Sequence, residues 1–218
     1  MRTPQGRKEF LLEGSLRNHY ANRIHGKEMG SFLDDFNLHA IQLYQYGREA
    51  YLKGDKETQN RCERLNFIIN SCRIPCSAYI GRGTDIAYSG PGVSIHYAAQ
   101  VGDWCVLGKN VSLAAAPTVG DHVYFATGAQ VIKSHCKIGS FSIIGANAVV
   151  TKDVPSFSVV TGIPGQVVTR ISPDNLEKYL ASYFATKHKN DPEFVEEVRE
   201  KFLRYYQIET ERQDNEAQ

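Results

Sequence analysis

The sequence predicts a mainly β protein, a parallel β-helix with α-helical segments before and after it. An aliphatic or aromatic residue recurs at every sixth position of "VGDWCVLGKNVSLAAAPTVGDHVYFATGAQV", residues 101 to 131. The two ends of the chain instead place apolar residues at helical spacing. Because a helix repeats near 3.6 residues and a strand near two, a repeat of six requires a larger unit, the stacked coil of a solenoid.

The six-residue repeat extends beyond this stretch, and three hexads make one triangular coil. The positions that follow it are Ile74, Ile80, Ile86, Ile95, Val101, Leu107, Leu113, Val119, Phe125, Val131, Ile138, Ile144 and Val150. If the bulky repeat residue is counted as the first place of its hexad, the fifth place holds a small or slim residue, as at Ala78, Ala99 and Ala129. A narrow interior needs this pairing of one bulky and one small residue per strand.

Two irregularities interrupt the repeat. Ile86 and Ile95 lie nine residues apart, so we expect "AYSGPGVS" to project between coils. Insertions in a solenoid commonly build its binding face. A single extra residue near His135 predicts a β-bulge.

The N-terminal domain is expected to span residues 1–73 and to contain about three helices. Their sequences are "EFLLEGSLRNHYANRIHG", "MGSFLDDFNLHAIQLYQYGREAYLKG" and "DKETQNRCERLNFIINSC". Asp55 or Thr58 is the expected N-cap of the third helix, and Pro75 is expected to end it.

The β-helix domain is expected over residues 74–168, followed by a C-terminal helical tail over 169–218. Ser172 followed by Pro173 predicts the start of one helix, and Asp191 followed by Pro192 predicts the start of another. The last ten residues are polar, so we expect them to fray.

Composition narrows the functional classes. The formal net charge is +1, so no electrostatic footprint for nucleic acid is present. No signal peptide and no apolar run of membrane-spanning length is evident. The five cysteines lack a CxxC pair, which favours a reducing compartment and a cytoplasmic protein. Cys105 occupies an inward fifth place, so we expect a core residue rather than a nucleophile.

Several segments resemble the hexapeptide-repeat acyltransferases, in the branch of serine acetyltransferase and its capsule and exopolysaccharide relatives. They are "IPCSAYIGRG", "AYSGPGVSIHYAAQVGD", "GANAVVTKDVP" and "VVTGIPGQVV". The resemblance is strong over residues 74 to 168 and looser in the N-terminal segment. It implies a left-handed β-helix, a homotrimer with active sites between adjacent prisms, and acetyl-CoA as the donor.

His96 is the predicted general base. Acetyl transfer from a thioester to a hydroxyl needs a base and then an acid, and one histidine with an ordinary pKa of about 6.5 can serve both steps. His96 follows the insertion, and "GPGVSIHYAA" resembles the "GLGIVIH" stretch of the capsule-associated relatives. A corner histidine with a structural hydrogen bond is the alternative.

Two positions depart from typical serine acetyltransferases. The family's catalytic histidine falls on Tyr88 here, and its orienting aspartate falls on Arg73, with Asp85 as a weak substitute. The predicted catalytic set is therefore His96, Tyr88 and Asp85. The departures weaken serine as the acceptor and favour a sugar.

The resemblance also implies a donor site, since the cofactor of this family runs along rungs of small residues. The matching positions are Gly128, Ala129, Gly145 and Ala146. Lys152 and Arg170 are candidate partners for its phosphates, with solvated surface as the alternative role.

Aromatic residues supply candidates for acceptor binding. Trp104 and His122 lie one coil apart at the fourth place, with Phe141 one coil further. This aromatic face is either a trimer contact or a wall for a sugar acceptor or the cofactor's adenine. Tyr97, beside His96, completes the predicted acceptor-binding set, and His135 is a second active-site candidate.

Three classes of function remain open. The leading one is a cytoplasmic acetyl-CoA-dependent O-acetyltransferase acting on a small acceptor, either a sugar of surface polysaccharide biosynthesis or serine. A non-catalytic trimeric scaffold is the second. The third, a zinc-dependent carbonic anhydrase, needs three converging imidazoles. Because His96, His122 and His135 occupy different places in their hexads, we expect no metal site.

Overall fold

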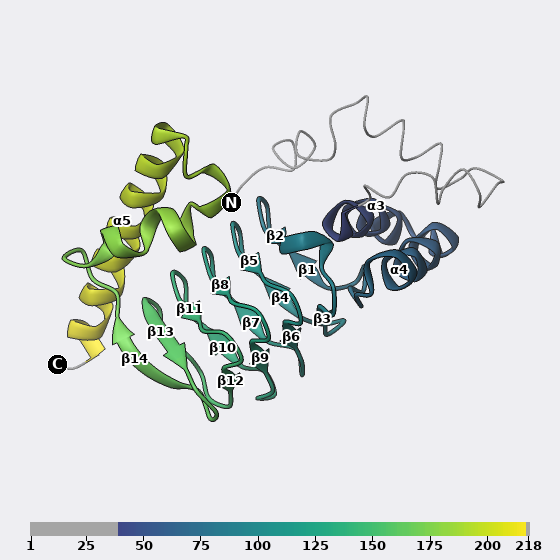
Figure 1. The fold of residues 1–218 in the computed structure, drawn as a ribbon. Helices are drawn as coiled ribbons and strands as arrows, with labels where there is room; N and C mark the ends of the chain where they lie inside the picture. Colours follow the sequence, from purple (N-terminus) through teal and green to yellow (C-terminus); the bar gives the residue numbers. More distant parts are fainter. Residues whose placement is uncertain (1–38, 217–218) are drawn as a thin grey trace.

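The computed structural model describes residues 39–216 and shows a parallel β-solenoid with helices at both ends (Figure 1). Helices α3 (Ala40–Lys53) and α4 (Lys56–Asn70) stand at the end of the solenoid where β1 (Tyr79–Ile80) begins. The C-terminal segment packs against its side and far end. The mainly β prediction is therefore confirmed.

Three sheets form the faces of the solenoid. The first contains β1 (Tyr79–Ile80), β4 (Gln100–Val101), β7 (Thr118–Val119) and β10 (Lys137–Ile138). The second contains β2 (Asp85–Ile86), β5 (Val106–Leu107), β8 (Tyr124–Phe125), β11 (Ile143–Ile144), β13 (Ser158–Thr161) and β14 (Gln166–Arg170). The third contains β3 (Ser94–Ile95), β6 (Ser112–Leu113), β9 (Gln130–Val131) and β12 (Val149–Val150).

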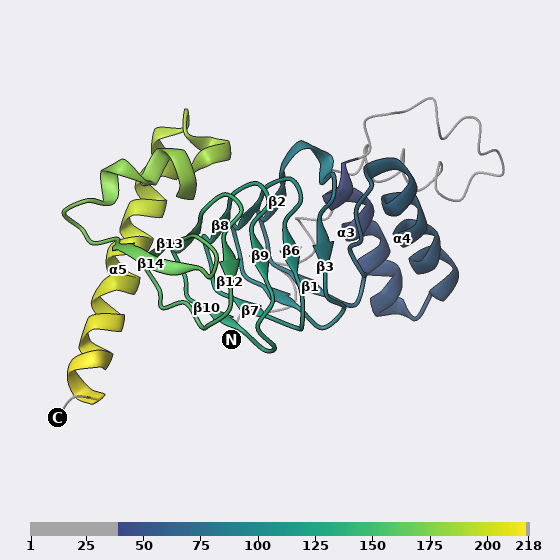
Figure 2. The ribbon, with the colours of Figure 1, turned by 60° about the horizontal axis from the view of Figure 1, so that its bottom comes forward.

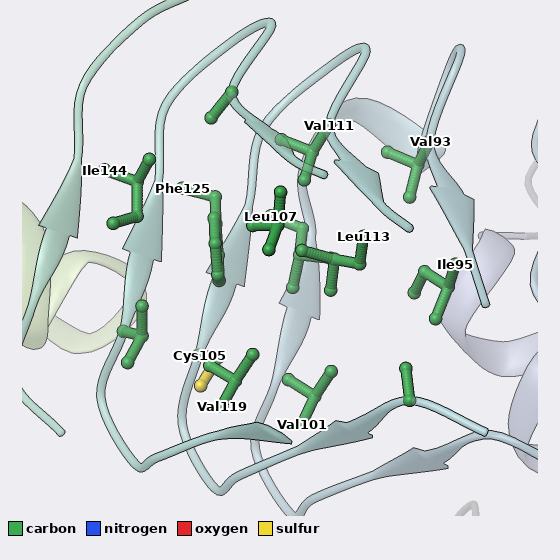
Figure 3. Close-up of a cluster of buried hydrophobic side chains, with 14 of the residues drawn as sticks. Val93, Ile95, Val101, Cys105, Leu107, Val111, Leu113, Val119, Phe125 and Ile144 are labelled. Carbon is green, nitrogen blue, oxygen red and sulfur yellow. The ribbon is translucent and has the colours of Figure 1, made fainter. Parts of the chain in front are cut away.

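The parallel register stacks equivalent places of successive hexads, as the repeat predicts. In the first sheet Ile80 pairs with Val101, which pairs with Val119. All repeat positions are buried except Ile80, which is partly buried (Figure 3). Burial of each large aliphatic side chain contributes roughly 1.5 to 3 kcal/mol, so this stacked interior is the main source of stability.

Three edges join the faces, and each is named here after one of its residues. The Tyr88 corner joins the second sheet to the third through residues 87–93, 108–111, 126–129 and 145–148. The His96 corner joins the third sheet to the first through residues 96–99, 114–117, 132–136 and 151–153. The Trp104 corner joins the first sheet to the second through residues 81–84, 102–105, 120–123 and 139–142.

Two antiparallel helices close the start of the solenoid. They are α3 (Ala40–Lys53) and α4 (Lys56–Asn70). Tyr44 anchors α3, because its hydroxyl donates to the Ala78 carbonyl at 2.7 Å and accepts from the Ile80 amide at 3.1 Å.

The expected boundaries of these helices are partly correct. Asp55 caps α4 by accepting from the Thr58 amide, as predicted. The helix ends at Asn70, where Ser71 turns left-handed at φ 51°, so Pro75 does not end it. The first expected helix and the start of the second lie outside the described residues.

The two irregularities differ in how far they follow the prediction. The insertion makes a short turn, η2 (Ala87–Ser89), in which Tyr88 is exposed as a projecting segment requires, whereas a Cβ on Gly90 would lie 3.2 Å from that of Ala40, so this end packs beneath α3. The extra residue near His135 lies in the corner between β9 and β10, and both strands keep their register. The predicted bulge there is wrong because a turn absorbs an added residue without breaking a ladder.

The C-terminal segment also differs from its predicted form. The helix expected from Ser172 is replaced by the short turns η3 (Leu176–Lys178), η4 (Leu180–Phe184, a π-helical turn) and η5 (Thr186–His188). The Asn175 side chain accepts from the Ser172 amide and donates to the Arg170 carbonyl, and these local bonds compete with an α-helix. The final helix, α5 (Pro192–Glu216), starts under the predicted Asp191 cap and continues through most of the segment expected to fray.

All five cysteines are buried free thiols. Burial raises the pKa of the Cys105 thiol to about 12, which confirms a core residue and not a nucleophile. Across residues 39–216, every helix is too short or too polar to cross a bilayer.

Candidate functional site

The structure gathers all four predicted donor-contacting residues on the Tyr88 corner. Gly128 and Ala129 lie on one coil, and Gly145 and Ala146 lie on the next. The Ala129 methyl group is fully buried in the solenoid interior, so this residue presents no side chain to a ligand. The coils stack through the corner itself, since the Asn147 amide donates to the Thr127 carbonyl at 3.0 Å.

Gly128 is required by this stacking. Its φ is +76°, and an added Cβ would meet the Asn147 side-chain oxygen at 2.0 Å. Ala146 is exposed and carries only a methyl group. The corner therefore presents a narrow edge on which a ligand can approach the backbone closely.

Tyr88 begins this edge in an unusual conformation. It is 73% exposed, and both Tyr88 and Ser89 have left-handed backbones, with φ of 57° and 62°. Two consecutive non-glycine residues in this region store strain, which is typical of functional sites. The Lys109 Nζ lies 4.2 Å from the centroid of the Tyr88 ring.

Lys109 is a residue of this edge that the sequence analysis missed. It occupies the third place of its hexad, one coil after the insertion, and its carbonyl accepts from the Gly128 amide at 2.8 Å. Lys109 could have been found by assigning each hexad to one of the three faces of the solenoid. That assignment places Lys109 on the same corner as Tyr88 and Gly128, on the coil between them.

His96 lies on a different edge. The ring is half-buried, and its centroid is 4.3 Å from that of the Tyr97 ring. The Ala98 amide donates to His96 Nδ1 at 3.2 Å, so the neutral ring carries its proton on Nε2. The structural hydrogen bond considered for a corner histidine is therefore present.

The three predicted catalytic residues do not meet within one chain. Tyr88 and Asp85 lie at the second sheet and the corner that follows it, whereas His96 lies on the His96 corner. The Asp85 carboxylate pairs with Lys187 Nζ at 2.5 Å. Asp85 consequently does not orient His96 of the same chain.

The predicted aromatic face exists on the Trp104 corner, but the chain's own C-terminal segment covers it. Trp104 packs against Phe194 of α5 at a centroid distance of 4.9 Å. His122 is 2% exposed and stacks on Phe141 at 4.7 Å. The face at His122 is therefore neither a trimer contact nor an open wall for a ligand, and this expectation is corrected.

A polar network fixes the proton of His122. Lys201 Nζ lies 3.2 Å from Nε2, and because an ammonium can only donate, Nδ1 carries the proton and faces the Phe184 carbonyl at 3.4 Å. Burial, reinforced by the Lys201 charge, lowers the pKa of His122 to about 3. The side chain is thus a neutral packing group at physiological pH.

Asp121 joins the same network. Its carboxylate accepts from Lys201 Nζ at 3.3 Å and from the Tyr205 hydroxyl at 3.0 Å. Burial opposes ionisation, but the Asp103 amide and Lys201 outweigh it and hold the pKa of Asp121 below its ordinary value. This network ties α5 to the solenoid.

The remaining candidates are spread over other surfaces. Lys152 is exposed on the His96 corner, away from the small residues of its own chain, and Arg170 Nη1 donates to Ser158 Oγ at 2.9 Å. His135 is exposed, with Nδ1 2.9 Å from Ser134 Oγ. Within the described part of the chain, no three His, Cys, Asp or Glu side chains gather to hold a metal ion.

A parallel β-solenoid built on a six-residue repeat is the fold of the hexapeptide-repeat acyltransferases. The chain belongs to the serine acetyltransferase family. It is 32% identical over 163 residues to the serine acetyltransferase of Staphylococcus aureus (strain Mu50), covering 71% of this chain and 73% of that protein.

A second curated relative agrees with this assignment, and a solved structure shares the fold. The chain is 34% identical over 144 residues to the serine acetyltransferase of Mycobacterium tuberculosis, and this match spans 62% of each protein. A solved serine acetyltransferase in complex with CoA shares the fold, with a TM-score of 0.56 and 23% identity over 59% of this chain and 55% of that one. No family model matches the sequence.

Proposed function

We propose that this protein is an acetyl-CoA-dependent O-acetyltransferase that acetylates a hydroxyl of a small acceptor. Membership of the serine acetyltransferase family is the observation that carries the proposal. The open edge of small residues at the Tyr88 corner supports it. We further propose a cytoplasmic enzyme, in keeping with five cysteines that form no disulfide.

The donor is proposed to lie along the Tyr88 corner, against Gly128, Gly145 and Ala146, since the Ala129 side chain is buried in the interior. A solved member of the family carries CoA, and this edge offers the close backbone approach that such a ligand needs. Lys109 is well placed to pair with a phosphate or to stabilise developing negative charge.

His96 is proposed as the general base. The acceptor oxygen attacks the thioester carbonyl while the base takes its proton, and the departing thiolate then recovers a proton as the carbon–sulfur bond breaks. For Nε2 to act, the ring proton has to move to Nδ1, which breaks the bond from Ala98. Losing that bond costs about 1 kcal/mol, which is small beside the hundred- to ten-thousandfold gain from a positioned base.

We propose that the enzyme is a homotrimer. His96 and the Tyr88 corner lie on different edges of one prism, so the base and the donor meet only where two copies lie side by side. In that arrangement Tyr88 reaches the site from the copy that holds the donor, and Lys152 reaches it from the copy that supplies His96. Sedimentation equilibrium should give three times the 24.4 kDa mass of the chain.

A sugar of surface polysaccharide biosynthesis is the favoured acceptor, with serine as the second candidate. Tyr88 and Arg73 stand where serine acetyltransferases carry their catalytic histidine and aspartate, which argues against simple transfer of the serine activity. A panel of serine, free sugars and sugar phosphates, assayed with acetyl-CoA, separates the two.

His96→Gln and His96→Asn test the base directly. Turnover, measured as free thiol released from acetyl-CoA, should fall by about a hundred- to ten-thousandfold in both variants, with CoA affinity unchanged. The Gln side chain places its amide nitrogen, a hydrogen-bond donor, near the position of His96 Nε2. The shorter Asn side chain places its amide group near the position of Nδ1. If Gln retained most of the activity, His96 would be a hydrogen-bond donor instead of the base.

A further inference from the structure

A groove between α4 and the first coil opens beside His96. Its volume of about 570 Å³ lies within the range of small-molecule sites. The residues that line it include Glu63, Arg64, Phe67, Arg73, Ser77 and Tyr97. Figure 2 shows α3 and α4 at the end of the solenoid where this coil begins. The groove lies apart from the Tyr88 corner proposed to hold the donor.

The groove carries two guanidinium groups that have no acidic partner among residues 39–216. Within the described residues, neither Arg64 nor Arg73 has a carboxylate within salt-bridge distance. The acid of the groove, Glu63, is already engaged, since its Oε1 accepts from the Cys76 amide at 2.8 Å and from Gln59 Nε2 at 3.1 Å. Arg64 and Arg73 can therefore bind an anion in this groove.

Two exposed rings flank these charges. Phe67 is 59% exposed and Tyr97 is 64% exposed, and the Arg73 guanidinium lies 5.8 Å from the Phe67 ring centroid. The backbone of Tyr97 is fixed, because its carbonyl accepts from Ser77 Oγ at 2.9 Å. Flat apolar faces beside a guanidinium suit a ligand that combines a sugar ring with an anionic group.

We propose that this groove binds a phosphate-bearing sugar as the acceptor. Guanidinium groups with no carboxylate partner among the described residues favour phosphate, which they can bind in a bidentate manner. Tyr97 packs against His96, so a sugar held on Tyr97 lies next to the proposed base. The role as acceptor rests on the proposed function, whereas the binding site does not.

Calorimetric titration of the full chain tests the site without turnover. The probes are the 1-phosphates of glucose, galactose and N-acetylglucosamine, each beside its free sugar, with serine and CoA as competitors. At least one sugar phosphate should bind about tenfold or more tightly than its free sugar, and Arg64→Gln and Arg73→Gln should each weaken it about tenfold. The control Arg204→Gln removes an exposed guanidinium on α5 and should bind as wild type.

Four results would overturn the site. They are equal affinity for every phosphate and its free sugar, unchanged binding in both arginine variants, displacement of the bound sugar phosphate by serine, and displacement by CoA.

Turnover separates this inference from the proposed function. Release of thiol with a sugar phosphate, with KM raised about tenfold and kcat retained in Arg73→Gln, supports both. Phosphate-dependent binding with no thiol release from any acceptor keeps the site and rejects the function. Thiol release with KM unchanged in both arginine variants keeps the function and rejects the site.

Discussion

The Trp104 and Tyr88 corners share a backbone and differ in what covers them. The fourth place of the hexad is left-handed on both, with φ of 58° at Trp104, 54° at His122, 56° at Asn110 and 76° at Gly128. On the Trp104 corner this place is Gly83 on the first coil and a large ring on the next three, and the C-terminal segment packs over the rings. On the Tyr88 corner it holds asparagine or glycine, and Asn110 and Asn147 stay exposed in the part of the chain that the structure describes. The size of this residue thus separates an edge that contributes to stability from an edge that a ligand can reach.

Phe141→Ala should disrupt the packing between the Trp104 corner and the C-terminal segment, and should produce the largest loss of stability. Phe141 is fully buried and packs against His122, Phe157, Phe184 and Phe202. Truncating a buried phenylalanine costs about 3 to 5 kcal/mol. Chemical denaturation should show this loss in the free energy of unfolding.

Phe67→Ala is the matched control, because Phe67 is 59% exposed on α4. Its truncation should change the free energy of unfolding by less than about 1 kcal/mol. Equal losses in the two variants would mean that the C-terminal segment does not cover the Trp104 corner.

A lower pH should reduce the free energy of unfolding, because His122 is buried in its neutral form on the Trp104 corner. The pKa of about 3 in the folded state lies below the ordinary value, so between the two the unfolded chain binds a proton that the folded chain does not. Stability therefore falls as the pH drops from about 6.5 toward 3, by up to about 1.4 kcal/mol per pH unit from this group. Denaturation at pH 7 and pH 5 should show a loss near 2 kcal/mol from this source.

His122→Gln isolates that contribution. The variant should be less stable at pH 7 and lose roughly 2 kcal/mol less than the wild type between pH 7 and pH 5. Identical pH dependence in the two proteins would mean that His122 is accessible to protonation in the folded state.

Much of the fold could be predicted because it depends on a local repeat. Within each coil, the aliphatic first place and the small fifth place are enough to predict which side chains fill the interior. The strands that pair between coils lie at these repeat positions. The Asp55 and Asp191 caps are equally local, since each accepts from amides two or three residues ahead.

The candidate site was harder to predict because it depends on which edge each residue occupies. The gathering of Gly128 and Ala146 on one corner was expected, whereas the separation of His96 from Asp85 and the position of Lys109 required the placement of the three sheets. The cover over His122 was missed because residues 176 to 202, distant in sequence, supply it.

Two tryptophan variants test directly whether the open Tyr88 corner holds the donor. Ala146→Trp places a large ring on that edge, and Leu203→Trp places the same ring on the exposed side of α5, away from both the Tyr88 and the His96 corners. Calorimetric titration with CoA should show affinity at least about tenfold weaker for Ala146→Trp and unchanged for Leu203→Trp. Wild-type affinity in Ala146→Trp, or equal weakening in both variants, would contradict the assignment of the donor to this corner.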